Sequence, residues 1–221
     1  ASQLSILCRK IRQSFDFSRC TEFTVEAGRP DTITREKLLA LREAGISRIS
    51  INPQSLSDQV LKNIGRRHSA QDVLEAFALA KELGFTNTNA DLIVGLPGDS
   101  LESFQKTLEG VIGLGASNVT VHSLALKRSA RLNAPGGDLS LHAKSEETAA
   151  MMDYSIARLT QEGFEPYYLY RQTRMAGNLE NTGWAKPGSI CRYNIYTMDE
   201  SNSVIACGAG GVSKLKDPYS G

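Results

Sequence analysis

Residues 21–55 read TEFTVEAGRPDTITREKLLALREAGISRISINPQS, and this stretch decides the fold. It contains two β-rich runs, Thr21–Val25 and Arg48–Ile51, which lie on either side of a helical pattern. A polar residue follows each run: Glu26 follows the first and Gln54 the second. In folds that alternate strands and helices, ligands bind at the carboxyl ends of the strands. The stretch therefore predicts a strand–helix–strand unit with polar side chains at its ligand-binding edge.

The same alternation continues downstream of this stretch. Ser69 and Asp72 form a capping-box pattern at the start of one further helix, and glycines follow the helical patterns as stop signals. Further helical patterns cover 57–64, 69–84 and 99–115, and further β-rich runs cover 87–97 and 117–126. Because strands that alternate with helical crossovers form a parallel sheet, the sequence predicts an α/β core, either open or curled toward a barrel.

The pattern changes in the second half of the chain. A loop with Pro and Gly over 132–140 precedes a longer helix over Leu141–Gln161, in which a pair of methionines is expected to fill the core. We then expect a short aromatic strand after Phe164, a loop that contains GWAKPGSICRYNIY, and a last strand that runs into CGAGG. The chain therefore divides into an α/β core over residues 1–137 and a C-terminal α+β extension of helix and strands over residues 138–221.

The composition excludes several classes of function. The chain has 221 residues, of which 41% are hydrophobic and 22% charged, and its formal net charge is +1. This balance supplies no basic surplus for binding nucleic acid or an anionic membrane. No apolar run is long enough to span a bilayer and no signal peptide opens the chain, so we expect a cytoplasmic protein. Four cysteines, Cys8, Cys20, Cys191 and Cys207, match no zinc, redox or iron–sulfur spacing, so we predict separate buried thiols and assign no metal ligand.

Polar residues stand at equivalent places on four successive strands: Glu26, Gln54, Asp91 and His122. In a parallel sheet, a polar residue within a strand must lie at the rim or be paired, because both faces are covered. The register therefore favours one shared rim for all four side chains. Each side chain also has a structural alternative: an ion pair of Glu26 with Arg29 or Arg48, a loop hydrogen bond for Gln54, a cap for Asp91 and a buried core position for His122.

Five motifs together carry a family resemblance: TVEAGRPDTIT, LREAGISRISINPQS, LKNIGRRH, NADLIVGLPGDS and ACGAGG. They resemble the radical S-adenosylmethionine (SAM) enzymes of the oxygen-independent coproporphyrinogen III oxidase group, close to the branch called coproporphyrinogen dehydrogenase. The resemblance implies a partial TIM-like barrel of parallel strands whose carboxyl rim holds a [4Fe-4S] cluster and SAM. It also implies a radical reaction of haem biosynthesis, in which propionate side chains of the tetrapyrrole coproporphyrinogen III lose hydrogen and carbon dioxide to give the vinyl groups of protoporphyrinogen IX.

The resemblance also implies cofactor-binding residues. Glu26 matches a carboxylate suited to an ammonium or hydroxyl donor, and Arg66 matches a guanidinium that can bind a carboxylate through two hydrogen bonds. Ala125 matches a close-approach position beside the adenosyl group. Two late glycines match a turn that faces the same cavity. The full set of implied positions is Glu26, Gln54, Arg66, Asp91, Ala125, Gly208 and Gly210, and no catalytic residue is assigned.

One part of the family pattern is missing from this sequence. Family members hold the cluster with a C-x-x-x-C-x-x-C run on the first strand and carry a GGTP segment after the second, and this sequence contains neither. Its first residues read as an amphipathic helix and resemble the helix after that GGTP segment. Cys8 and Cys20 are too far apart in sequence to replace the run. We therefore expect the chain to be a fragment of an enzyme. By itself, this fragment should bind neither SAM nor a cluster and should be inactive.

The missing strands would leave the strand at Thr21–Val25 on an exposed edge. An exposed apolar edge invites pairing with another chain. We therefore expect self-association through this edge, or cover from the N-terminal helix that contains Leu4, Ile6 and Ile11.

Two other functions stay open. One is a haem chaperone of the same superfamily, which binds without catalysing, and the other is a cluster-free α/β enzyme on the same scaffold. The chaperone relatives carry HN after the cysteine of a late CR.N segment, whereas ICRYNIY places Tyr193 there. The preceding GNLENTGWAKPG segment is typical of the dehydrogenase branch. These two features favour the oxidoreductase over the chaperone.

Overall fold

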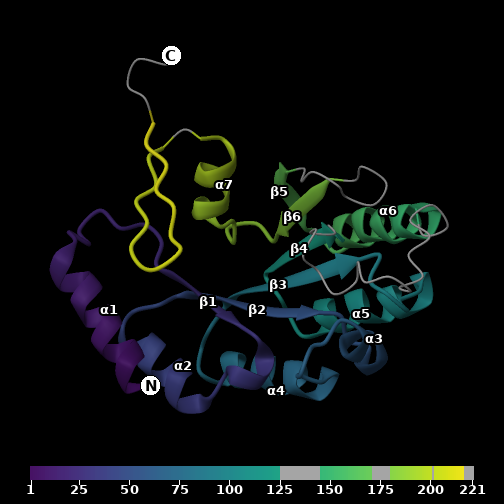
Figure 1. Cartoon of the computed structure of the whole chain (residues 1–221), viewed down its shortest axis with the longest axis horizontal. Coiled ribbons are helices and arrows are strands. Elements are labelled where there is room, and N and C mark those ends of the chain that lie inside the picture. The colour runs from purple at the N-terminus through teal and green to yellow at the C-terminus, as the bar shows by residue number, and fades with distance from the viewer. Residues whose placement is uncertain (125–144, 171–179, 201, 217–221) are drawn as a thin grey trace.

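A computed structural model of the chain describes residues 1–124, 145–170, 180–200 and 202–216, and its centre is a six-stranded sheet (Figure 1). The strand order is β1-β2-β3-β4-β6-β5. The strands are β1 (Thr24–Gly28), β2 (Arg48–Gln54), β3 (Asn87–Val94), β4 (Asn118–Ser123), β5 (Glu165–Tyr170) and β6 (Asn181–Ala185). The helices are α1 (Ser2–Ser14), the 3-10 helix η1 (Pro30–Thr32), α2 (Arg35–Glu43), α3 (Asp58–Asn63), α4 (Ala70–Glu82), α5 (Leu101–Gly113), α6 (Ser145–Gln161) and α7 (Arg192–Met198).

The first four strands are parallel, and helices connect them in chain order. The prediction of an α/β core of parallel strands with crossover helices is therefore confirmed. β6 runs antiparallel to both β4 and β5, so the C-terminal strands continue the same sheet. β5 consequently runs in the same direction as β4. Within the described residues, no helix is both long and apolar enough to cross a bilayer.

Local signals place the helix ends where the sequence puts them. The Thr34 hydroxyl accepts a hydrogen bond from the Lys37 N–H at the start of α2. Ser69 and Asp72 form the predicted capping box at the start of α4, each side chain bonding the other's backbone N–H. Gly45 follows α2 with φ +79°, a backbone conformation that is unfavourable for residues with a side chain. These caps explain why the crossover helices were predictable from short sequence windows.

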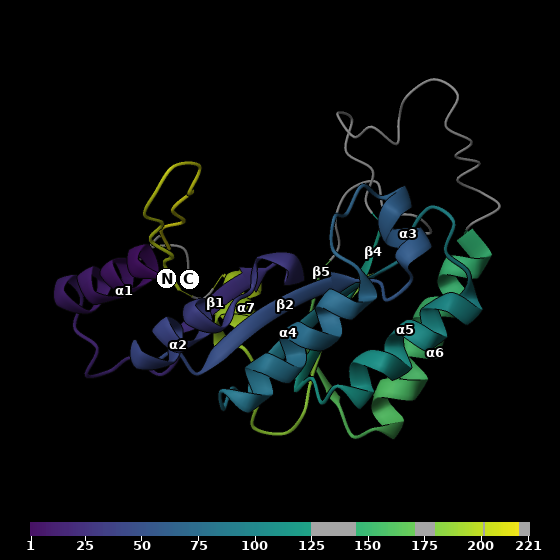
Figure 2. The same cartoon turned by 90° about the horizontal axis from the view of Figure 1, so that it is seen from below.

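The sheet has one apolar face and one polar face. In β3, Thr88, Ala90, Leu92 and Val94 are buried, while the residues between them are only partly buried. Figure 2 shows α2, α4, α5 and α6 covering the apolar side. The core also takes in the predicted methionine pair and apolar residues from several elements: Ile49, Ile51, Phe104, Leu108, Met151, Met152 and Trp184. The opposite face carries the polar residues and is described below.

Four expectations for the C-terminal half need correction or fall outside the described residues. The expected loop with GWAKPGSICRYNIY instead contains β6 and α7. The expected last strand into CGAGG does not form in the described residues. This segment has only an isolated antiparallel bridge between Val204 and Lys214, outside the sheet. Flanking apolar residues Ile205 and Val212 are exposed there, so no burial stabilises a strand. The loop at 132–140 and the start of the expected helix at 141–144 lie outside the described residues.

Gly183 explains why β6 resembled a loop in the sequence. It lies directly opposite Tyr168 of β5, and a Cβ at this position would overlap the Tyr168 ring. The glycine is therefore needed for close packing of two strands and does not mark a turn. The cysteine prediction is correct for Cys8 and Cys191, which are buried, but wrong for Cys20 and Cys207, which are exposed; all four are free thiols.

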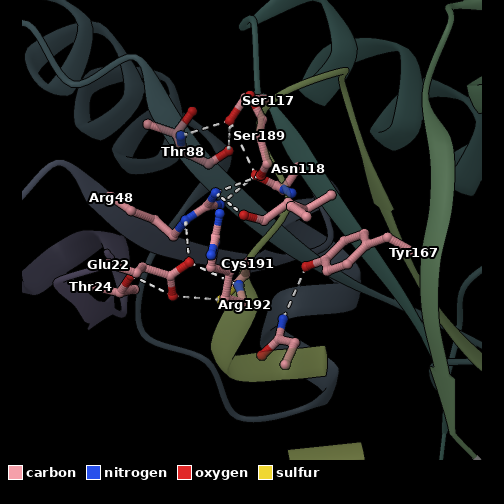
Figure 3. A network of polar contacts seen from close by, with 12 residues as sticks. Glu22, Thr24, Arg48, Thr88, Ser117, Asn118, Tyr167, Ser189, Cys191 and Arg192 are labelled. Atoms are coloured by element: carbon pink, nitrogen blue, oxygen red, sulfur yellow. Dashed lines mark hydrogen bonds and ion pairs between the residues drawn. The ribbon is translucent and has the colours of Figure 1, made fainter. Parts of the chain in front are cut away.

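Arg48 fixes the C-terminal segment to the amino end of the sheet (Figure 3). Its guanidinium is buried and donates to Asn118 Oδ1 at 2.6 Å and to the carbonyl oxygens of Ser189 and Ile190 at 2.5 and 2.8 Å. Its carboxylate partner is Glu22, at 3.9 Å. One buried cation thus joins β2, β4 and the segment before α7.

The same network excludes one alternative for Glu26. Arg48 pairs with Glu22, and Arg29 pairs with Asp31 at 3.2 Å, so neither arginine forms the ion pair with Glu26 that the sequence left open. Glu22 also accepts hydrogen bonds from the Arg192 N–H at 2.8 Å and the Cys191 thiol at 3.3 Å. Burial, as the largest cause, raises the pKa of this thiol to about 11, so Cys191 acts as a neutral donor here.

We predict that Arg48→Met lowers the free energy of unfolding by about 3 kcal/mol, because it leaves buried acceptors of β4 and the C-terminal segment without a donor. Urea denaturation monitored by circular dichroism measures the change. Arg35→Met is the matched control, since Arg35 forms only an exposed ion pair with Glu82 and should alter stability little. Equal stabilities of the two variants would contradict the proposed anchoring role of Arg48.

The outer edge of β1 is open within the described residues, because β1 pairs only with β2. Helix α1 packs beside α2, as Figure 1 shows, and does not form a neighbouring strand. Leu4 packs against the core, whereas Ile6 and Leu7 are more than half exposed. A cavity of about 460 Å³ lies between α1, α2 and β1, and its lining includes Leu4, Leu7 and Val25. Helix α1 therefore covers the flank of β1 and leaves its backbone edge free.

We propose that the 221-residue chain, produced alone, self-associates by pairing the β1 edges of two copies. Sedimentation velocity over a range of concentrations should show a dimer at high concentration. Amide hydrogen exchange should show added protection for residues 24–28 in the dimer and no change in α5. A monomer at every concentration, with unprotected β1 amides, would refute this proposal.

Candidate functional site

The polar face of the sheet holds the candidate site. We use this name for the face opposite the covering helices. Its residues occupy alternate positions along the strands: Glu26 on β1, Ser50 and Asn52 on β2, Asn89 and Asp91 on β3, and Thr120 and His122 on β4. Because side chains alternate sides along a strand, four adjacent parallel strands bring these residues into one layer.

Hydrogen bonds link this layer across the strands. Asn89 donates from Nδ2 to Ser50 Oγ at 3.0 Å and to Asp91 Oδ1 at 2.8 Å. Thr120 Oγ1 donates to Asn89 Oδ1 at 3.3 Å and lies 3.2 Å from the Tyr168 hydroxyl. The polar side chains therefore satisfy one another in a connected network, which lowers the free-energy cost of partly burying this polar layer.

Glu26 and Asp91 are the two carboxylates of the polar face. Desolvation of the Glu26 carboxylate is the largest cause of its raised pKa, and the Asp91 charge is the second. Hydrogen bonds from Ser50 and Asn52 oppose this rise. Glu26 is nevertheless exposed to solvent, so its carboxylate remains accessible to a ligand. Two neighbouring carboxylates on an accessible surface suit a ligand with ammonium or hydroxyl donors.

Gln54 ends β2 in a strained conformation. Its φ is +66°, which is unusual for a residue other than glycine, and its side chain is buried. The β2–β3 register shifts between Ile51 and Gln54. Strain of this kind persists where surrounding structure enforces it and is frequent at ligand sites. Its position at the carboxyl end of β2 matches the sequence prediction.

His68 tethers the GRRH turn to the end of β2. The buried imidazole lies 3.0 Å, through Nε2, from the carbonyl oxygen of Pro53, the residue before Gln54. Arg66 is therefore held near the carboxyl end of β2, half-buried, and its side chain makes no ion pair or hydrogen bond within the described part of the chain. A guanidinium so placed is available to an anion.

The structure therefore brings some of the predicted residues together and separates others. Glu26, Gln54 and Asp91 lie on the adjacent strands β1, β2 and β3. Gln54 ends its strand as predicted, whereas Glu26 and Asp91 sit in the middle of theirs, so the predicted strand-end position is wrong for these two. Gly208 and Gly210 have positive φ and lie in an exposed hairpin, the yellow segment that extends on the α1 side of the molecule in Figure 1. Ala125 lies outside the described residues. The cofactor-binding roles of all seven positions stay predictions.

Sequence reasoning missed several residues of the polar face. Asn89 and Thr120 hold the network together, and Tyr168 and Tyr170 extend it onto β5 with their rings stacked. Alternation within β3 and β4 was a signal that could have found the first two. The tyrosines gave no such signal, because their place beside β4 depends on β6. Within the residues that the structure describes, no three His, Cys, Asp or Glu side chains are arranged to hold a metal ion.

The raised pKa of Glu26 predicts a pH-dependent cost to the fold. The ordinary pKa of Glu26 is 4.5, so its carboxyl group ionises at a lower pH in the unfolded chain than in the folded chain. Ionisation therefore lowers the free energy of unfolding as the pH rises, and the full loss is reached above the higher pKa of the folded state. Glu26→Gln should therefore raise the free energy of unfolding at pH 7, with a gain that shrinks as the pH falls and disappears below 4.5. Denaturant titrations across this range measure it.

Glu36→Gln is the matched control for this prediction. Backbone hydrogen bonding at the start of α2, as the largest cause, lowers the pKa of Glu36, so its removal should cost stability at pH 7. A Glu26→Gln variant that is no more stable than the wild type at pH 7 would contradict the argument.

Comparison with known proteins identifies the domain. Residues 6–111 match the model of the Radical SAM superfamily. The chain is 41% identical to the oxygen-independent coproporphyrinogen-III oxidase-like protein HemZ of Bacillus subtilis, over 100% of this chain and 44% of that protein. It is 30% identical to the heme chaperone HemW of the same organism, over 94% of this chain and 51% of that protein.

A solved structure shows the same fold. The coproporphyrinogen III oxidase HemN of Escherichia coli, a radical SAM enzyme, matches 90% of this chain and 42% of its own with a TM-score of 0.66 and 24% identity. The predicted partial TIM-like barrel is therefore confirmed. The chain spans about half the length of the curated relatives it matches. The chain thus contains a domain of the radical SAM superfamily, and its likeness is to the oxygen-independent coproporphyrinogen III oxidase-like proteins of that superfamily.

Proposed function

We propose that this chain is part of a radical SAM oxidoreductase that oxidatively decarboxylates coproporphyrinogen III to protoporphyrinogen IX in haem biosynthesis. The observation that carries the proposal is the pair of neighbouring carboxylates, Glu26 and Asp91, on the polar face of a radical SAM domain. The oxidase-like name of the relative with 41% identity supports the choice of substrate. We further propose that these 221 residues are inactive by themselves.

The polar face fits SAM by its chemistry. SAM carries an ammonium, a carboxylate and ribose hydroxyls. Glu26 and Asp91 can accept hydrogen bonds from the ammonium and the hydroxyls. The guanidinium of Arg66, which has no side-chain partner among the described residues, can bind the carboxylate. Gly28, at the end of β1, has positive φ and open space where a Cβ would stand, so a ligand can approach the backbone there. These residues of the chain would hold and orient the cofactor.

The residues present do not fit a [4Fe-4S] cluster. Such a cluster needs several thiolates close together, whereas the described residues contain no such group: Cys8 and Cys191 are buried, and Cys20 and Cys207 are exposed. Bound SAM, after reductive cleavage, would supply the chemistry that abstracts hydrogen from the substrate. The contribution of this chain is to fix SAM in place.

A haem chaperone is the second candidate function. The relative named heme chaperone HemW, at 30% identity, favours it. Tyr193, in place of the histidine of the chaperone relatives, weighs against it. Haem titration of the full-length protein separates the two: a stable haem complex without turnover of coproporphyrinogen III would favour the chaperone. A cluster-free enzyme on this scaffold, the third candidate, would turn over substrate without SAM.

The test of the proposed oxidoreductase compares two proteins. Calorimetry should find little or no SAM binding to the 221-residue chain, and tight binding to a full-length protein reconstituted with iron and sulfide. In the latter, Glu26→Ala or Asp91→Ala should weaken SAM binding by about 1 to 3 kcal/mol, the usual cost of an unmatched polar partner. Tight SAM binding by the short chain, or unchanged affinity in both variants, would refute the assigned site.

A further inference from the structure

Three residues from three strands form a row on the polar face, in which one hydrogen bond joins Tyr170 to His122 and a longer polar contact joins His122 to Asp91. His122 of β4 lies between Asp91 of β3 and Tyr170 of β5. The distance from His122 Nε2 to Asp91 Oδ1 is 3.8 Å, and the distance from His122 Nδ1 to the Tyr170 hydroxyl is 3.0 Å. The side chains of His122 and Asp91 are 25% and 21% exposed, so a ligand can reach them. The resemblance assigned no role to His122 or Tyr170.

The partners of Tyr170 determine the direction of its hydrogen bond. The Ser123 N–H donates to Asn181 Oδ1 at 2.8 Å, which leaves the amide group of Asn181 to donate to the Tyr170 oxygen. Burial, followed by the charge of Asp91, raises the pKa of Tyr170, so the phenol keeps its proton. The Tyr170 O–H therefore donates to His122 Nδ1. A backbone amide at the end of β4 thus sets the orientation of the whole row.

The direction of that hydrogen bond selects the histidine tautomer. A neutral imidazole that accepts at Nδ1 carries its proton on Nε2. The Nε2–H of His122 then faces Asp91 Oδ1, the same oxygen that accepts from Asn89 at 2.8 Å. The Asn89 amide donates a hydrogen bond to this oxygen, and the His122 Nε2–H attracts it from beyond hydrogen-bond distance. The other oxygen, Oδ2, is left to accept from a ligand.

We propose that His122, oriented by Tyr170, is a positioning residue that holds the Asp91 carboxylate with Oδ2 directed at a hydroxyl-bearing part of the cofactor. This inference rests on the proposed function, because SAM is the ligand assigned to the polar face. The role resembles that of the groups that orient ligating side chains in other sites, where the outer partner fixes both tautomer and direction. His122 itself exchanges no proton or electron with the substrate.

Two conservative variants separate positioning from packing. In His122→Gln the amide nitrogen can reach the place of Nε2 and donate to Asp91. In His122→Asn the amide reaches only the place of Nδ1, so the Tyr170 contact is kept and the Asp91 contact is lost. Calorimetry on the reconstituted full-length protein should show SAM affinity near wild type for His122→Gln. It should show affinity weaker by about two-fold or more for His122→Asn, because a polar contact longer than a hydrogen bond contributes less than a hydrogen bond does.

Equal losses in both variants, or no loss in His122→Asn, would overturn the positioning role. A second readout needs no cofactor. Nitrogen-15 NMR of the full-length protein labelled in histidine should show His122 as the Nε2–H tautomer, and Tyr170→Phe should produce a mixture of tautomers. A wild type that binds no SAM would refute the proposed function. In that case the NMR result decides for His122: an Nδ1–H or mixed tautomer in the wild type overturns the inference.

Discussion

The alternation of side chains along four parallel strands is the constraint on which the rest of this structure depends. In β3 every second residue is buried under helices, and the residues between them, including Asn89 and Asp91, face the other way. A sheet with this pattern can bury its apolar face completely and still present a connected polar layer. The site is therefore a by-product of the same periodicity that builds the core, and it cannot shift by one residue without exposing that core.

The polar layer is stable because its members satisfy one another. Asn89 alone links Ser50, Asp91 and Thr120, so three strands share one amide side chain. A buried polar group without a partner costs free energy, and such a network removes most of that cost. The Glu26 carboxylate is the exception: burial, followed by repulsion from the Asp91 charge, raises its pKa. A cationic or hydroxyl-rich ligand would relieve this repulsion, which is a physical reason for the layer to bind one.

The C-terminal segment completes the sheet on one side and closes its amino end. β6 pairs with β4, and β5 then places its tyrosines beside the polar layer, where Gly183 leaves room for the Tyr168 ring. At the other end, Arg48 binds two carbonyl groups of the segment before α7. Within the described residues, this contact covers the amino end of the sheet.

Local sequence patterns by themselves determined the element order, the parallel core and the helix caps, because each depends on residues within one turn or one strand. Thr34, Ser69 and Gly45 act on their own helix ends. The positions of Glu26 and Asp91 were also readable, since alternation is a local property. Only the tertiary structure decided which polar groups meet: His122 with Tyr170, 48 residues apart, and Arg48 with Ile190, 142 apart. Those contacts depend on strand order and register. Distant segments of the chain determine both together, so no short window of sequence contains them.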